Sequence, residues 1–175
     1  RLPEEILLQL EGHARVDLWD SDLPPDSDSL VDHVREAEGL FCLLTDHVDK
    51  ALIQQAKSLR VISNMPAGTD NIDLHSATLR GIPVGNTPGV LTETTADFAF
   101  ALLMAAARGI VDGDKYVRDG HWRTWGPSVL LGQDIFGKTL GIIGYGAIGQ
   151  AVARRAQGFS MDVLYHSRSE KEIDK

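Results

Sequence analysis

The chain has 175 residues, of which 43% are hydrophobic, and its 25 acidic residues outnumber 17 Lys and Arg to give a formal net charge of −8. No basic stripe is present, which argues against a nucleic-acid partner. The single cysteine, Cys42, excludes an internal disulfide framework and favours a reducing compartment. The longest apolar segment, residues 96–107, is too short to span a bilayer, and no signal peptide is visible. We therefore expect a cytoplasmic protein without a membrane partner.

The first 91 residues alternate expected helices with expected strands. Apolar residues at helical spacing predict the helices, and short continuous apolar runs predict the strands. Ser27 or Asp28 is expected to cap the second helix, after the chain break at Leu23-Pro24-Pro25-Asp26. The expected helices are 3–11, 28–37, 50–57 and 74–80, and the expected strands are 15–19, 40–44, 60–63 and 82–85. This alternation is typical of an open parallel α/β sheet.

Residues 92–108 predict one long helix that ends at Gly109. Its apolar residues run nearly all round the helix, so we expect it to be buried between layers and to join two domains, with a cleft at one end. The chain is accordingly divided into domains 1–91 and 92–175. Trp122 and Trp125 follow the helix, and they fit either a core or a contact with a second subunit.

The second domain is organised around residues 138–169. An apolar run at 139–143 predicts a buried strand, residues 150–157 predict a helix, and residues 161–165 predict a second strand. Between the first strand and the helix lies Gly144-Tyr145-Gly146-Ala147-Ile148-Gly149, a complete G-x-G-x-x-G. The strands, glycines and helix follow one another in the order of a dinucleotide-binding unit. A glycine-rich turn that binds no ligand can have the same sequence pattern and is the alternative.

The three glycines of this motif have different expected roles. Gly144 permits a tight turn, Gly146 lets a pyrophosphate approach the backbone, and Gly149 lets the helix pack closely on the sheet. The N–H groups of Ala147 and Ile148 would then face the phosphates at the start of the helix.

The end of the second strand bears on the choice of cofactor. NAD sites usually carry an acid there for the ribose hydroxyls. This chain has His166-Ser167-Arg168-Ser169 and no acid before Glu170. A hydroxyl beside a guanidinium suits a ribose 2′-phosphate, so Ser167 and Arg168 favour NADP(H) over NAD(H). An exposed arginine in a polar loop is the alternative.

A second candidate site lies at residues 63–73, SNMPAGTDNID, after an expected strand. Ligands of open α/β sheets bind at the carboxyl ends of the strands. Gly68 permits unusual dihedral angles, so successive N–H groups here could form an anion nest. Asx-rich turns taken alone are usually only turns.

Two blocks, SNMPAGTDNIDLHSATLRGIPVGNTPGVLTETTADFAFALLMAAAR and GKTLGIIGYGAIGQAVARRAQGFSMDVLYHSRS, closely resemble the D-isomer-specific 2-hydroxyacid dehydrogenases, and within them the glyoxylate/hydroxypyruvate reductase branch. The resemblance implies a flavodoxin-like substrate-binding domain followed by the first part of a Rossmann domain. It implies that the Ala67 and Gly68 amides hold the substrate carboxylate, that residues 145–148 wrap the pyrophosphate, and that Thr95 lies near the nicotinamide. It further implies a homodimer joined through the cofactor domain, to which residues 110–131 belong.

Two positions depart from that family. Ala147 stands where many relatives carry Arg or Lys, which removes one charge from the phosphate side. Ser167 stands where NAD-using relatives carry Asp, in agreement with NADP(H).

By this resemblance the protein reduces a small 2-oxo acid, glyoxylate or hydroxypyruvate, to the D-2-hydroxy acid with a hydride from NADPH. An NAD-dependent relative of the phosphoglycerate, D-lactate or formate type and a non-catalytic, NAD(P)-sensing corepressor remain as alternatives. The family's catalytic Arg, acid and His lie beyond residue 175, none of the six His matches a motif, and we expect no metal site. We expect the chain to be cut at both ends and inactive alone.

Overall fold

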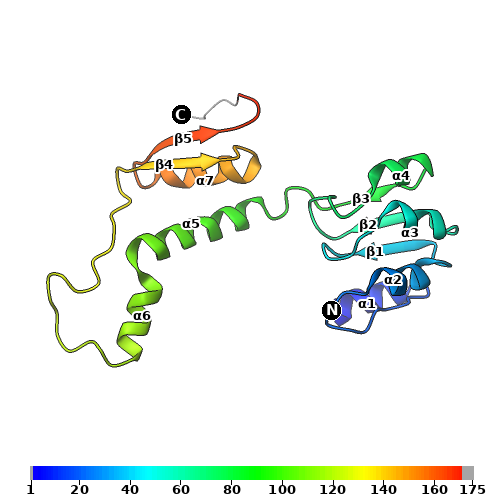
Figure 1. Cartoon of the computed structure of the whole chain (residues 1–175), viewed down its shortest axis with the longest axis horizontal. Coiled ribbons are helices and arrows are strands. Elements are labelled where there is room, and N and C mark those ends of the chain that lie inside the picture. Colours follow the sequence, from blue (N-terminus) through cyan, green and yellow to red (C-terminus); the bar gives the residue numbers. More distant parts are fainter. Residues whose placement is uncertain (1, 171–175) are drawn as a thin grey trace. The chain divides into compact units, whose positions relative to one another are not determined.

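The computed structural model of the chain describes residues 2–170 and divides it into two compact units, Arg1–Pro88 and Gly89–Lys175 (Figure 1). Both units combine parallel strands with helices, which confirms the α/β class. The boundary lies close to the division after residue 91 that the sequence suggests.

The first unit is a three-stranded parallel sheet in the order β1-β2-β3, with Leu40 opposite Ile62 and Ile62 opposite Val84. Its strands are β1 (Gly39–Cys42), β2 (Val61–Asn64) and β3 (Val84–Gly85), and its helices are α1 (Glu4–Glu11), α2 (Ser27–Val34), α3 (Lys50–Gln55) and α4 (Leu74–Leu79). Helix α3 packs against both α2 and α4. The side chains of Cys42, Ile53 and Ile62 are completely buried at the centre of this core.

Two expectations for the first unit are wrong. Residues 15–19 form no strand, because this segment lies against α2 instead of beside another strand: Asp17 bonds to His33 Nδ1 at 2.8 Å, and the Trp19 ring meets the His33 ring edge to face. The cap of α2 is Asp26, one residue before the expected pair, and its Oδ1 accepts from Ser29 N at 2.8 Å. This hydrogen bond lowers the pKa of Asp26.

The second unit contains helices α5 (Thr92–Arg108), α6 (Ile110–Arg118) and α7 (Ala147–Gln157), together with strands β4 (Thr139–Ile143) and β5 (Asp162–His166). The two strands pair in parallel, from Thr139 opposite Asp162 to Ile143 opposite His166. Helix α7 connects them, and α5 packs along α7. Small buried residues let α7 approach its neighbours closely: Gly149, Ala151, Ala153 and Ala156.

Helix α5 is not buried all round, contrary to the sequence-based expectation. Ala96 and Phe100 are buried, and the Phe100 ring lies 5.1 Å from that of Phe159, whereas Phe98 is 64% and Leu102 54% exposed. The reason is that, within the described part of this unit, α7 covers only one face of the helix. In residues 2–170 no single helix is long and apolar enough to cross a membrane; α5 and α6 would suffice together, but they bend by 59° where they meet.

No helix was expected in the segment that follows α5, but the structure has α6 there. Gly109 ends α5 in the left-handed conformation (φ 59°), and α6 begins at the very next residue. Trp122 and Trp125 follow in an irregular segment and are both exposed, so they do not belong to the core of this unit.

Candidate functional site

The glycine motif forms the turn from β4 into α7. Gly144 has a φ of +95°, a conformation that side chains disfavour, which fits its expected role in the tight turn. Its N–H donates to the carbonyl oxygen of His166 at 2.9 Å. The glycine turn therefore lies beside the end of β5, where Ser167 and Arg168 follow.

The other two glycines differ in what a side chain would meet. A Cβ on Gly146 would meet nothing within 4 Å, so the backbone there is open to an approaching ligand. A Cβ on Gly149 would collide with the carbonyl oxygen of Gly144 and lie 3.3 Å from Cγ2 of Ile142. Gly149 is thus required for the close packing of α7 on β4, as the motif predicts.

Helix α7 begins at Ala147, three residues earlier than expected, so the motif itself supplies the first helical turn. No side chain caps this end of the helix. The amides of Ala147, Ile148 and Gly149 are the first N–H groups of the helix, which carry partial positive charge and have no partner within it. Because both Ala147 and Ile148 are exposed, this end of the helix can receive an anion.

The side chain of Tyr145 is packed inside the protein and does not face solvent. The residue is 3% exposed, and its ring stacks on that of Tyr165 with the ring centres 4.3 Å apart. Its carbonyl oxygen accepts from Gln150 Nε2 at 3.3 Å. Any ligand contact of Tyr145 therefore comes from its backbone.

The residues expected to select the cofactor follow β5 directly. Ser167 is half-buried, and Arg168 is exposed. Within residues 2–170 no carboxylate pairs with Arg168.

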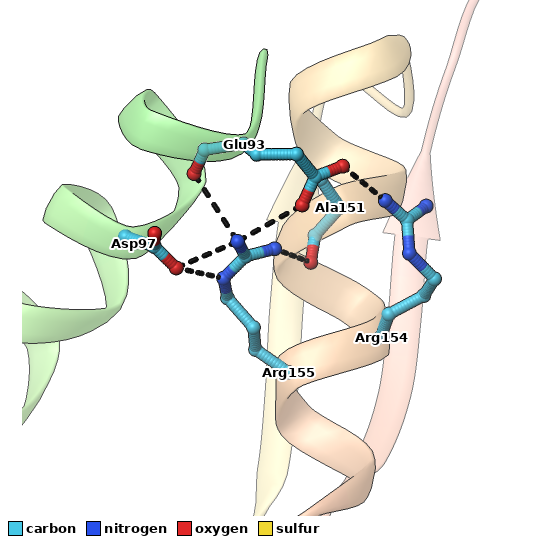
Figure 2. Close-up of polar contacts among 5 residues, drawn as sticks. All are labelled: Glu93, Asp97, Ala151, Arg154 and Arg155. Carbon is cyan, nitrogen blue, oxygen red and sulfur yellow. Dashed lines mark hydrogen bonds and ion pairs between the residues drawn. The ribbon is translucent and has the colours of Figure 1, made fainter. Parts of the chain in front are cut away.

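Helices α5 and α7 are joined by an ion-pair cluster that the sequence analysis missed (Figure 2). Arg155 contacts Asp97 Oδ1 at 2.6 Å and Glu93 Oε2 at 2.9 Å, and it also donates to the carbonyl oxygen of Ala151 at 2.8 Å. Arg154 reaches Glu93 Oε1 at 2.6 Å. The bonds to Asp97 and Glu93 raise the pKa of Arg155. The sequence signal was present, as two acids four residues apart on one helix and two adjacent arginines on another.

The cluster fixes the first turns of α5, which carry Thr95. The Thr95 side chain is exposed, and its N–H donates to Leu91 O at 2.8 Å as part of the helix. Both arginines of α7 are engaged by acids.

In the first unit, the loop that follows β2 holds Ala67 and Gly68. Ala67 is half-buried and Gly68 is exposed. The expectation that Gly68 uses unusual dihedral angles is wrong: its φ lies outside the positive region, and a Cβ there would lie an ordinary 3.6 Å from Asp70 Oδ2. A nest built on a left-handed glycine is therefore not what this loop forms.

The loop is held through its carbonyl oxygens instead. Ala67 O accepts from Asn86 Nδ2 at 2.6 Å, and Gly68 O accepts from Asn64 Nδ2 at 2.9 Å. Thr87 holds Met65 O through its hydroxyl at 2.6 Å and Pro66 O through its N–H at 3.3 Å. In the described part of the chain, no acceptor lies on the N–H groups of Ala67 or Gly68. Two adjacent donors remain for an anion.

No other reactive group of the described residues competes with these two sites. All six histidines are exposed: His13, His33, His47, His75, His121 and His166. Burial raises the pKa of the Cys42 thiol to about 12, with a smaller contribution from the charge of Asp46, so the thiol stays protonated at neutral pH. Among residues 2–170 no group of three or more His, Cys, Asp or Glu could hold a metal ion.

Comparison with known proteins identifies the family of the chain. The family model described as D-isomer specific 2-hydroxyacid dehydrogenase, catalytic domain, matches residues 2–170. A glyoxylate reductase of Korarchaeum cryptofilum is 51% identical over 98% of this chain and 52% of its own length. A crystal structure of a protein from Thermus thermophilus has a TM-score of 0.90 and 45% identity over 98% of this chain and 55% of its own. An acyclic imino acid reductase in complex with NADPH and D-Arg has a TM-score of 0.83 and 25% identity over 99% of this chain and 55% of its own. The chain spans about half the length of the curated relatives it matches.

Proposed function

Because the chain belongs to the D-isomer-specific 2-hydroxyacid dehydrogenase family, we propose that its protein reduces a small 2-oxo acid, glyoxylate or hydroxypyruvate, to the D-2-hydroxy acid. The observation that carries the proposal is the uncapped start of α7 behind the open Gly146, beside the end of β5. A bound nicotinamide supplies the hydride for the carbonyl carbon.

The backbone of the glycine turn holds the pyrophosphate in this proposal. Amides of Ala147 and Ile148 point out of the first turn of α7, where anions are stabilised by free N–H groups and the helix dipole. Gly146 leaves room for the phosphate oxygens, and Gly149 keeps α7 close to β4 so that the amides stay in place. Thr95, in the first turn of α5, is assigned to the nicotinamide end of the site.

We assign NADP(H) rather than NAD(H) as the preferred cofactor. Ser167 and Arg168 follow β5 beside the glycine turn, where an acid would select a ribose with a free 2′-hydroxyl. An exposed guanidinium without an acidic partner in residues 2–170 offers two parallel donors to a phosphate. An NADPH complex within this fold family supports the assignment.

The substrate carboxylate is assigned to the N–H groups of Ala67 and Gly68. These are adjacent donors with no acceptor in residues 2–170, and the carbonyl oxygens around them are already engaged by Asn64, Asn86 and Thr87. Hydrogen bonds to a carboxylate are charge-assisted and are about twice as strong as neutral ones.

The second unit also carries the surface that we assign to a homodimer. Large apolar side chains lie exposed between residues 110 and 131, and large exposed apolar patches mark protein–protein interaction sites. They are Ile110, Val111, Val117, Trp122, Trp125, Leu130 and Leu131.

The test uses the protein produced from its complete gene. Initial rates of NADPH and NADH oxidation are measured with glyoxylate and with hydroxypyruvate. Faster turnover with NADPH is expected. Equal or faster rates with NADH would refute the NADP(H) assignment, and no turnover with either acid and either cofactor would refute the reductase. Residues 1–175 alone, assayed in parallel, are expected to show no turnover.

A further inference from the structure

Two buried carboxamides lie beneath the loop of residues 65–70. Asn64 is 1% and Asn71 8% exposed. Asn64 Nδ2 lies 3.1 Å from Asn71 Oδ1, and Asn71 Nδ2 lies 3.2 Å from Asn64 Oδ1, so each amide donates to the other. Because an unsatisfied buried amide costs free energy, such a pair is stable only when its remaining polar atoms also find partners.

The remaining donors of the pair reach backbone carbonyl oxygens. Asn64 uses its second N–H on Gly68 O at 2.9 Å, and Asn71 Nδ2 reaches Leu43 O at 3.0 Å and Asp46 O at 3.1 Å. Carbonyl oxygens only accept hydrogen bonds, so these contacts fix which side of each amide is nitrogen. The Cys42 thiol donates to Asn64 Oδ1 at 3.3 Å. The amide pair thus links the ends of β1 and β2 to the loop of residues 65–70.

The direction of the loop N–H groups follows from the held carbonyls. The described residues contain no cis peptide bond, and in a trans peptide the C=O of one residue points opposite to the N–H of the next. The bond from Thr87 N to Pro66 O therefore turns the Ala67 N–H away from Thr87, and the bond from Asn86 Nδ2 to Ala67 O turns the Gly68 N–H away from Asn86. The bond from Asn64 Nδ2 to Gly68 O fixes the orientation of the peptide that joins Gly68 to Thr69.

We propose that Asn64 and Asn71 are positioning residues for carboxylate binding, which hold the carbonyl group of Gly68 and so fix the backbone that carries the Ala67 and Gly68 N–H groups. They act through the loop and do not touch the substrate. This inference rests on the proposed function, because it assumes that the anion in this loop is the carboxylate of a 2-oxo acid.

The variant Asn64→Asp tests the inference in the full-length protein. It keeps the size of the side chain but replaces the Nδ2 donor by an oxygen that faces Gly68 O and Asn71 Oδ1. The KM for glyoxylate and for hydroxypyruvate is expected to rise about 10-fold or more, since a charge-assisted bond to the carboxylate is weakened. The kcat and the KM for the cofactor are expected to change less than about twofold, because a carboxylate contact is equal in the ground and transition states.

Ser76→Ala is the matched control. Ser76 is also a buried polar residue of the first unit, its hydroxyl donates to Asp73 Oδ2 at 2.9 Å, and it has no bond to the loop. It is expected to lower thermal stability with the KM unchanged. If Asn64→Asp lowers stability as Ser76→Ala does but leaves the KM within twofold, the pair is merely structural and the inference is overturned. Should Asn64→Asp fail to fold, Asn71→Ser carries the same test.

Binding of oxamate, an unreactive analogue of glyoxylate, separates this inference from the proposed function. In the wild-type protein, oxamate is expected to shift the amide NMR signals of Ala67 and Gly68, and in Asn64→Asp these shifts require about 10-fold more oxamate. This result without turnover would refute the reductase and leave the positioning role standing. Oxamate that leaves both signals unmoved in the wild type would overturn the positioning role.

Discussion

The two candidate anion sites of this chain present free backbone N–H groups by opposite means. In the glycine turn, side chains are absent: Gly146 leaves open space, and Gly149 allows contact between α7 and β4. In the loop after β2, side chains hold the backbone, because the buried Asn64 and the exposed Asn86 and Thr87 bind its carbonyl oxygens. The glycine turn therefore depends on the absence of side chains at its glycines. The loop after β2 depends on side chains of residues that lie outside the loop itself.

The largest expected effect comes from adding a methyl group to the glycine turn. Gly149→Ala places a Cβ against the Gly144 carbonyl oxygen, so α7 must move away from β4. A destabilisation of about 1–3 kcal/mol, typical of overpacking, is expected in chemical denaturation. Gly146→Ala is the matched variant, since its Cβ meets no protein atom within 4 Å.

The matched variant should separate folding from binding. Gly146→Ala is expected to unfold at nearly the wild-type denaturant concentration and to bind NADPH about 10-fold more weakly, because its methyl group occupies the space assigned to the pyrophosphate. Equal stability of the two variants, or unaltered NADPH affinity in Gly146→Ala, would contradict the division of roles between the glycines.

A second prediction concerns the end of β5. Arg168→Asp is expected to lower the ratio of kcat/KM for NADPH to that for NADH by about 10- to 100-fold, because a charge-assisted bond to the 2′-phosphate becomes a repulsion. Arg35→Asp makes the same change of charge at an exposed residue of the first unit, paired with Asp32 at 2.8 Å, and should leave the ratio unaltered. A similar fall in both variants would show that net charge, not the position of Arg168, controls the preference.

Sequence reasoning succeeded where a constraint is local. The spacing of three glycines and two apolar runs predicted β4, the turn, α7 and β5, because each step depends on neighbouring residues. It failed at residues 15–19, whose contacts with His33 are long-range, and at Gly68, whose loop is shaped by Asn64 and Asn86. The exposure of Phe98 on α5 could not be predicted either, because an apolar helix sequence does not show which neighbouring elements cover the helix.

The ion-pair cluster between α5 and α7 offers a third, smaller test. Arg155→Gln removes contacts to both Glu93 and Asp97, whereas Arg154→Gln removes a single contact to Glu93. A modest drop in melting temperature is expected for Arg155→Gln and a smaller one for Arg154→Gln, with both differences shrinking at high salt because exposed charges are screened. Drops that are equal, or insensitive to salt, would show that the cluster does not fix α5 on α7.

The last prediction concerns Cys42, whose thiol reports on the loop of residues 65–70 without disturbing it. The thiol is fully buried, donates to Asn64 Oδ1, and has its pKa raised to about 12. At pH 8 the thiolate fraction is then only ~10⁻⁴. A thiol reagent can react only when the loop and the end of β1 open locally. Labelling of the native protein should be at least ~10³-fold slower than labelling in denaturant. Asn64→Asp, which loosens the loop, should label faster than Ser76→Ala, whereas equal rates in the two variants would mean that the amide pair does not hold this region closed.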